Sequence, residues 1–259
     1  MDIKLYSYLF GLFGTDGTVH RNRTQEHIGY FQLELIDKDI INKICNKLNN
    51  CSQSERVRDT NFKKSYHSYT LYCNNKEFIQ WCEFNGFPLK DKTNHIAPPL
   101  LNYSKPDFWR GIIDGDGSIG RKQATNEPFI SLVTKSEALK NAFEEYIEEI
   151  TGFRPRNQRN KRDGVFNVTI HGEKAVKLTE VIYQNSNIYI DRKYKKYLEN
   201  RVWSKPDTTN KYHFKWSEQE LQDLLTLSIE EFIAKYPNRT RNAIYAKRRR
   251  IKKGGEEHQ

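Results

Sequence analysis

Two aspartates, Asp16 and Asp116, occupy the same place in two copies of one sequence pattern. The copies are residues 8–19 (YLFGLFGTDGTV) and residues 108–119 (FWRGIIDGDGSI), which lie 100 residues apart. Each copy is typical of an apolar helix that contains one glycine and ends at the aspartate, before a strand begins. The helix dipole opposes a carboxylate at this end, so we expect a bound cation to offset the unfavourable placement.

The chemistry that suits these residues is hydrolysis of a phosphodiester. Mg²⁺ held by one or two carboxylates makes a water nucleophilic and stabilises charge on the leaving oxygen, and phosphate oxygens complete its coordination. The sequence contains no histidine cluster that would indicate a different kind of metal centre. Because the acid recurs at the same place in a long repeat, we expect two similar halves about a pseudo-twofold axis, with the acids meeting as a pair.

At residues 9–17 and 109–117 the sequence resembles the LAGLIDADG homing endonucleases, in the form that carries both halves on one chain. The doubled motif is specific, and the resemblance covers about residues 1–203. It implies that the two motif helices pack together through their glycines. It also implies that Asp16 and Asp116 bind Mg²⁺ beside the scissile phosphates, at sites that Mn²⁺ or Ca²⁺ can also occupy.

The resemblance further implies a basic residue near each active site. Lys92 lies 76 residues after Asp16, and Lys193 lies 77 residues after Asp116. This near-equal spacing makes the two lysines the candidates for a catalytic role.

One position departs from the family pattern. Gly14 stands where the second copy has Asp114 and where the family usually has an acid that is commonly structural. Because that acid is commonly structural, its absence does not decide whether the protein cleaves DNA. We expect Gly14 to loosen the end of the first helix.

Apolar periodicity, capping residues and turn signals predict the same order of elements in each half. Residues 86–106 are rich in Pro, Lys and Asn and are expected to connect the halves. Asp37 is expected to be the N-cap of the helix at 38–48. The first half is predicted to contain helices at 4–15, 38–48 and 76–84 and strands at 18–23, 30–35, 56–59 and 66–73. The second is predicted to contain the motif helix, helices at 136–150, 173–183 and 191–203, and strands at 118–121, 128–134, 153–160 and 165–171.

These elements predict an α+β fold with two pseudo-symmetric αββαββα halves, residues 1–97 and 98–203. Each half is expected to have a four-stranded antiparallel sheet with helices on one face. Basic residues recur on the predicted strands and hairpin tips, where alternation would place them on the exposed faces as a DNA-binding saddle. The residues expected to bind DNA in this way are Arg21, Arg23, Arg56, Arg58, Lys63, Arg121, Arg154, Arg156 and Arg159.

A small trihelical domain is predicted at residues 212–253, after a linker at 204–211 and before a tail at 254–259. Ser217 and Ser228 are expected to cap its first two helices, and residues 239–253 contain eight Lys or Arg and no acid. The pattern resembles a Myb/SANT-like helix-turn-helix domain, in which the third helix enters the major groove of DNA. That resemblance places Arg241, Asn242, Tyr245 and Arg249 on or near bases.

Composition narrows the class of protein. The net charge of +10 and the isoelectric point of about 9.3 favour a polyanionic partner. The mean hydropathy of −0.86, with no apolar run near the ~20 residues that span a bilayer, argues against a membrane protein. The start of the chain lacks the layout of a signal peptide, and the four cysteines show no CxxC spacing. We therefore expect an intracellular protein, cytoplasmic or associated with DNA.

These observations together predict a monomeric homing endonuclease that makes a Mg²⁺-dependent double-strand break in a long asymmetric DNA target. Two other classes stay open. One is a DNA-binding transcriptional regulator that keeps this scaffold without cleavage, although retention of both motif acids argues against it. The other is an RNA-splicing maturase on the same fold, for which RNA would be the partner.

Overall fold

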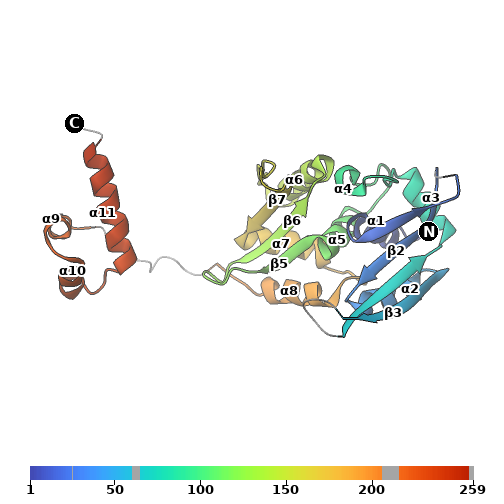
Figure 1. The fold of residues 1–259 in the computed structure, drawn as a ribbon, viewed down its shortest axis with the longest axis horizontal. Helices are drawn as coiled ribbons and strands as arrows, with labels where there is room; N and C mark the ends of the chain where they lie inside the picture. Colours follow the sequence, from blue (N-terminus) through green and yellow to red (C-terminus); the bar gives the residue numbers. More distant parts are fainter. Residues whose placement is uncertain (25, 60–64, 206–215, 257–259) are drawn as a thin grey trace. The chain divides into compact units, whose positions relative to one another are not determined.

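The helices that carry the repeated pattern, α1 (Ile3–Thr15) and α5 (Lys105–Gly115), pack side by side between two antiparallel sheets (Figure 1). The computed structural model describes residues 1–24, 26–59, 65–205 and 216–256. The chain divides into two units, Met1–Lys205 and Pro206–Gln259. The motif helices and both sheets belong to the first of these, which we call the larger unit.

The first half of the larger unit follows the predicted order of helices and strands. Its sheet has the strand order β1-β2-β4-β3, with every neighbouring pair antiparallel. After α1 the elements are β1 (Gly17–Arg21), β2 (Ile28–Leu35), α2 (Lys38–Lys47), β3 (Cys51–Arg58), β4 (Tyr66–Cys73) and α3 (Lys76–Phe84).

The second half repeats this order with one strand fewer among the described residues. A short helix, α4 (Lys92–His95), lies in the connection, and the second sheet has the antiparallel order β5-β6-β7. After α5 the elements are β5 (Gly117–Arg121), β6 (Pro128–Thr134), α6 (Glu137–Thr151), β7 (Phe166–His171), α7 (Gly172–Tyr183) and α8 (Asp191–Arg201). The predicted α+β fold of two similar halves is confirmed, whereas the strand predicted at 153–160 is wrong.

Residues 153–160 are held by α6 and do not pair with β7. Pro155 has no N–H to donate to a strand ladder. Arg154 forms ion pairs with Glu145 (3.1 Å) and Glu148 (3.3 Å), both of which belong to α6. The hairpin turn itself does form, because the N–H of Asn160 donates to the carbonyl of Val165 (2.8 Å).

Each sheet buries one face and leaves the other open, as period-two alternation requires. On the helix-covered side of the first sheet Phe31, Leu33 and Leu71 are fully buried. Their alternating neighbours point the other way, and we call that side of each sheet its outer face. The outer faces are therefore surfaces that a large partner can reach.

The smaller unit consists of α9 (Glu218–Thr226), α10 (Ile229–Lys235) and α11 (Arg241–Glu256). Ser217 and Ser228 each cap a helix in a capping box, as predicted. The core of this unit is formed by Leu224, Phe232 and Ile244, with Trp216 packed against it. Across the described parts of both units, no helix is long and apolar enough to cross a membrane.

Candidate active site

Close backbone packing brings the ends of the two motif helices together. A Cβ atom on Gly11 would lie 2.5 Å from the carbonyl oxygen of Phe108, and one on Gly111 would lie 2.1 Å from that of Tyr8. Both distances are too short for a side chain, so only glycine permits this packing. The structure confirms the sequence-based reason for a glycine inside each helix.

Asp16 and Asp116 are the C-cap residues of α1 and α5. The N–H of Asp16 donates to Leu12 and that of Asp116 donates to Ile112, each at 3.0 Å. Both side chains reach the surface. A Cβ atom on Gly115 would lie 3.2 Å from Oδ2 of Asp16, so that carboxylate lies against the opposite motif helix.

Partial burial raises the pKa of both carboxyl groups above the ordinary aspartate value. For Asp116 the neighbouring charge of Asp16 raises the pKa further, while the ammonium groups of Lys92 and Lys193 oppose the rise for both acids. Two carboxylates that disfavour each other's charge form a site that a divalent cation would stabilise.

Lys92 and Lys193 lie beneath the C-terminal ends of the motif helices. The Nζ atom of each lysine donates to carbonyl groups in the last turn of the motif helix and at the first residue of the strand that follows it. Lys193 is the more deeply buried, with 6% of its surface exposed. The acceptors are Phe13 (3.1 Å), Thr15 (2.5 Å) and Gly17 (2.6 Å) for Lys92, and Ile113 (2.5 Å), Asp114 (2.6 Å), Gly115 (3.1 Å) and Gly117 (2.9 Å) for Lys193.

Burial also makes the two lysines weaker bases. It lowers the pKa of Lys193 to about 8 and lowers the pKa of Lys92 below its ordinary value. The aspartates near each lysine oppose this change. At neutral pH Lys193 therefore still donates as an ammonium, and it begins to lose its proton just above.

Asp114 and Gly14 take matching positions but close their helix ends differently. The carboxylate of Asp114 is fully buried and accepts hydrogen bonds from Tyr8 Oη (2.8 Å), Tyr183 Oη (2.6 Å) and the N–H of Ile190 (2.9 Å). A Cβ atom on Gly14 would lie 2.6 Å from Cδ1 of Ile96. Apolar packing by Ile96 thus occupies the space that an acid would need in the first half.

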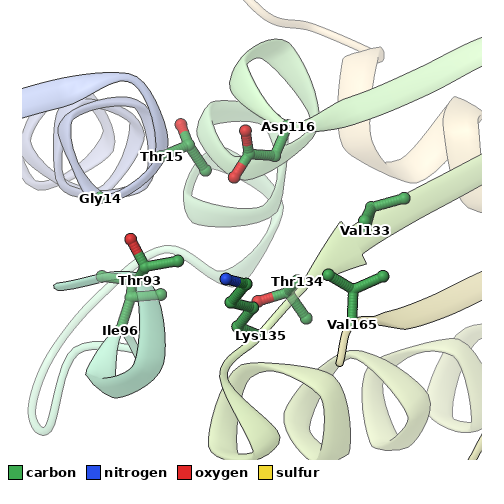
Figure 2. Close-up of a pocket in the computed structure, with 9 residues that line it drawn as sticks. All are labelled: Gly14, Thr15, Thr93, Ile96, Asp116, Val133, Thr134, Lys135 and Val165. Carbon is green, nitrogen blue, oxygen red and sulfur yellow. The ribbon is translucent and has the colours of Figure 1, made fainter. Parts of the chain in front are cut away.

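Asp16 and Asp116 each line a separate cleft. The Asp116 cleft is bounded by the end of α1, by α4 and by the ends of β6 and β7 (Figure 2). The Asp16 cleft is bounded by the end of α5, by outer-face residues of the first sheet and by the start of α8. The lining residues are Gly14, Thr15, Thr93, Ile96, Val133, Thr134, Lys135 and Val165 around Asp116, and Glu34, Leu35, Ile36, Asp37, Arg58, Tyr66, Ser68, Gly115 and Arg192 around Asp16.

Sequence reasoning missed Lys135 and Arg192. It placed Asp37 correctly at the N-cap position of α2 but missed the contact that its carboxylate makes. Asp37 makes no capping bond to α2; its carboxylate accepts instead from Nε of Arg192 (3.0 Å) in the other half. This contact joins residues 155 positions apart, so no local pattern could reveal it. The signal that could have pointed to Lys135 is its place in the repeat, because Lys135 follows β6 as Ile36 follows β2.

The basic residues predicted to bind DNA separate into distinct groups. Arg56 and Arg58 lie on the outer face of the first sheet, in register with Ser68 and Tyr66. Arg21 ends β1, Arg23 and Arg156 are exposed, and Lys63 lies outside the described residues. The remaining three make contacts within the second half: Arg121 with Glu199 and Asn200 of α8, Arg154 with α6, and Arg159 with the carbonyls of Lys135 and Gly164.

In the smaller unit, α11 presents an exposed stripe on the side opposite its core contact, Ile244. Arg248 is not part of the stripe, because its guanidinium donates to Leu224 (2.8 Å) and Leu227 at the end of α9. We name the exposed residues of this helix the α11 stripe. It contains Arg241, Asn242, Tyr245, Ala246, Arg249 and Arg250.

The donor set of the two clefts fits a hard divalent cation that shares its coordination with a bound phosphate. Within the described residues no group of three or more His, Cys, Asp or Glu side chains could hold a metal ion by itself. Mg²⁺ does not need such a group, since it retains waters and binds through one or two carboxylates plus phosphate oxygens. Asp16 and Asp116 supply those carboxylates.

Comparison with known proteins connects this geometry to a fold family. Residues 106–196 match the family of LAGLIDADG-like domains, and no curated protein matches the sequence. The homing endonuclease I-WcaI bound to its DNA recognition sequence is 16% identical over 78% of this chain and 88% of that chain, with a TM-score of 0.54. I-DmoI in complex with DNA and Ca is 14% identical, covers 74% and 95% and has a TM-score of 0.49. Full-length DUF199/WhiA from Thermatoga maritima is 14% identical, covers 98% and 92% and has a TM-score of 0.45.

The likeness to I-WcaI rests on overall structure at low sequence identity, so it bears on the fold alone. The match at residues 106–196 spans the second motif helix and Asp116. Residues 106–196 therefore match a LAGLIDADG-like domain by sequence, and most of the chain has a fold similar to that of the homing endonuclease I-WcaI.

Proposed function

We propose that this protein is a site-specific, Mg²⁺-dependent DNA endonuclease that makes a double-strand break. The observation that carries the proposal is the pairing of Asp16 and Asp116 at packed helix ends, each in a cleft continuous with the outer face of a sheet. A duplex that lies along both outer faces would bring one strand to each acid. Each acid would then serve one phosphodiester.

In this proposal the two acids and the two lysines have different roles. Mg²⁺, when bound, supplies the activated water and stabilises the leaving oxygen. Asp16 and Asp116 hold the cation and orient the phosphate. Lys92 and Lys193 act as positioning residues, because their ammonium groups donate into the helix ends that aim the acids.

Binding of DNA is supported by charge and by the composition of two surfaces. The net charge of +10 attracts the phosphate backbone. Arg56 and Arg58 on the first sheet can contact bases or phosphates in the major groove. The α11 stripe of the smaller unit would extend the contact and add affinity. Because the two halves differ in sequence, we infer that the target is asymmetric.

A second candidate is a DNA-binding regulator that does not cleave. The α11 stripe favours it, since a basic helix face on a separate unit would bind DNA without either acid. The two candidates differ in one property: only an endonuclease needs the carboxylates of Asp16 and Asp116.

The test is cleavage of a randomised DNA library by the full chain, with Mg²⁺ and with EDTA. We expect discrete Mg²⁺-dependent breaks with 3′ overhangs, as in the resembled family. Asp16→Asn and Asp116→Asn should each slow cleavage by about 1,000-fold or more while DNA binding persists. The exposed Glu173→Gln on α7 is the matched carboxylate-to-amide control. Salt-sensitive binding with no cleavage in any condition would instead support the regulator.

A further inference from the structure

The two clefts differ at one matching position, and this inference rests on the proposed function. Lys135 directly follows β6 and precedes Ser136, the N-cap of α6. Ile36 directly follows β2 and precedes Asp37, the residue before α2. Each lines the cleft of the acid in its own half. The same place in the fold therefore holds an ammonium in one cleft and an aliphatic side chain in the other.

Lys135 is exposed, and its side chain extends into the space near Thr93 and Asp116 (Figure 2). Its Nζ atom makes no hydrogen bond or ion pair with the part of the chain that the structure describes. The Coulombic field of a free ammonium in a cleft is directed at whatever anion enters. A phosphate group is the anion that the proposed function would bring there.

The backbone that carries Lys135 is firmly held. Its carbonyl accepts from Nη2 of Arg159 (3.3 Å), and the N–H of Ser136 donates to Oγ1 of Thr134 (3.1 Å). Oγ of Ser136 then donates to the carbonyl of Ile96 (2.6 Å) in the wall of the cleft. The base of the side chain is thus fixed while its charged end is free.

In the Asp16 cleft the position of Ile36 carries no charge, and this residue is 54% exposed. Two guanidinium groups line this cleft, but each faces a carboxylate. Arg58 pairs with Glu34 (3.3 Å), and Arg192 pairs with Asp37 (3.0 Å). Among the described residues that line it, no basic side chain lacks an acidic partner.

We propose that Lys135 binds the scissile phosphate in the Asp116 cleft and that the two strands are therefore cut by unequal sites. In the step it assists, the oxygen of water forms a new bond to phosphorus and the bond from phosphorus to the leaving oxygen breaks. The proton lost by the water is balanced by the one that the leaving oxygen gains. Lys135 stabilises the negative charge on the phosphoryl oxygens. The strand in the Asp116 cleft is cut first, and a nicked duplex precedes the double-strand break.

The test follows each strand of a supercoiled plasmid that carries the selected target, with the two strands labelled separately. Lys135→Ala should slow cleavage of one strand by about 10- to 100-fold, as loss of a charge-assisted contact predicts, and nicked plasmid should accumulate. Lys135→Arg should restore much of the rate. The reciprocal change, Ile36→Lys, should speed cleavage of the other strand.

The outcomes separate this inference from the function on which it rests. A wild-type chain that cuts neither strand would overturn the proposed endonuclease and the inference together. Wild-type cleavage in which Lys135→Ala slows both strands equally, or neither, would overturn only the role of Lys135. Unchanged thermal unfolding of the exposed Lys135→Ala variant is the control for folding.

Discussion

The two halves of the larger unit share a backbone plan but complete it with different side chains. In both, a lysine caps the motif helix and an aspartate ends it. Behind the second acid lies a buried network around Asp114, whereas behind the first lies the apolar contact between Gly14 and Ile96. The two halves therefore match where a lysine must donate hydrogen bonds to backbone carbonyls at the helix end. They differ behind the acids, where either a polar network or an apolar side chain can fill the space.

The outer faces of the sheets differ in a similar way. The first carries Arg56 and Arg58 together with His20, which stacks on Tyr30 at 4.3 Å. Among the described residues, the outer positions of the second sheet hold no lysine or arginine. They are Ser118, Gly120, Phe129, Ser131, Val133, Asn167, Thr169 and His171. Arginine recognises guanine edges and apolar groups contact thymine methyls, so the two half-sites should differ in base composition.

The largest effect we expect comes from breaking the polar network that only the second half possesses. Asp114→Ala should lower the free energy of unfolding by about 3–5 kcal/mol, because it leaves buried donors on Tyr8 and Tyr183 without an acceptor. Urea denaturation measures this. Gly14→Ala is the matched change in the first half and should cost about 1 kcal/mol, since only the flexible end of Ile96 must move. Equal costs at the two positions would contradict the comparison.

A second effect is a pH dependence that belongs to Lys193. Its pKa is about 8 in the folded chain and 10.5 ordinarily, so between these values the unfolded chain binds more protons. Stability contributed by this group therefore rises with pH across that interval, by up to about 3 kcal/mol. The unfolding free energy of the wild type minus that of Lys193→Met, measured from pH 7 to 10.5, reports it. A difference that falls with pH would mean that hydrogen bonds to the carbonyls outweigh burial.

A third experiment tests whether the α11 stripe of the smaller unit contributes to DNA affinity beyond the two halves of the larger unit. The double variant Arg241→Ala/Arg249→Ala removes two charges from the α11 stripe and should weaken DNA affinity by about 10-fold. It should also reduce the slope of log affinity against log salt by nearly two. Strand-specific cleavage rates at saturating enzyme should not change. Lys174→Ala/Lys177→Ala on α7 is the control with equal charge, and an identical loss there would argue against a dedicated surface.

The most local effect we expect concerns one base contact. Arg56→Ala should weaken binding by about 5- to 50-fold and relax the preference at one guanine in the half-site read by the first sheet. Repeating the target selection with the variant measures both changes. Loss of preference in the other half-site, or an equal loss for every sequence, would show that Arg56 contacts phosphate instead.

The local features predicted from the sequence are those that depend on neighbouring residues. The helix ends at Asp16 and Asp116, the caps at Ser217 and Ser228, and most strands follow from short patterns. The strand predicted at residues 153–160 was wrong because the preceding helix and a proline compete with strand pairing there. Residues 153–160 alternate like a strand, but Arg154 pairs with α6 and Pro155 interrupts the ladder.

The repeat in the sequence was enough to predict two similar halves whose helices each end in an acid, and the family resemblance implied that these helices pack through their glycines. Which charges are free could be read only from the folded chain. Arg192 is neutralised by Asp37, the lysines expected to act in catalysis donate to helix carbonyls, and Lys135 is left without a partner among the described residues. Asp37 and Arg192 lie 155 residues apart, so their pairing is set by three-dimensional proximity and no spacing along the chain encodes it.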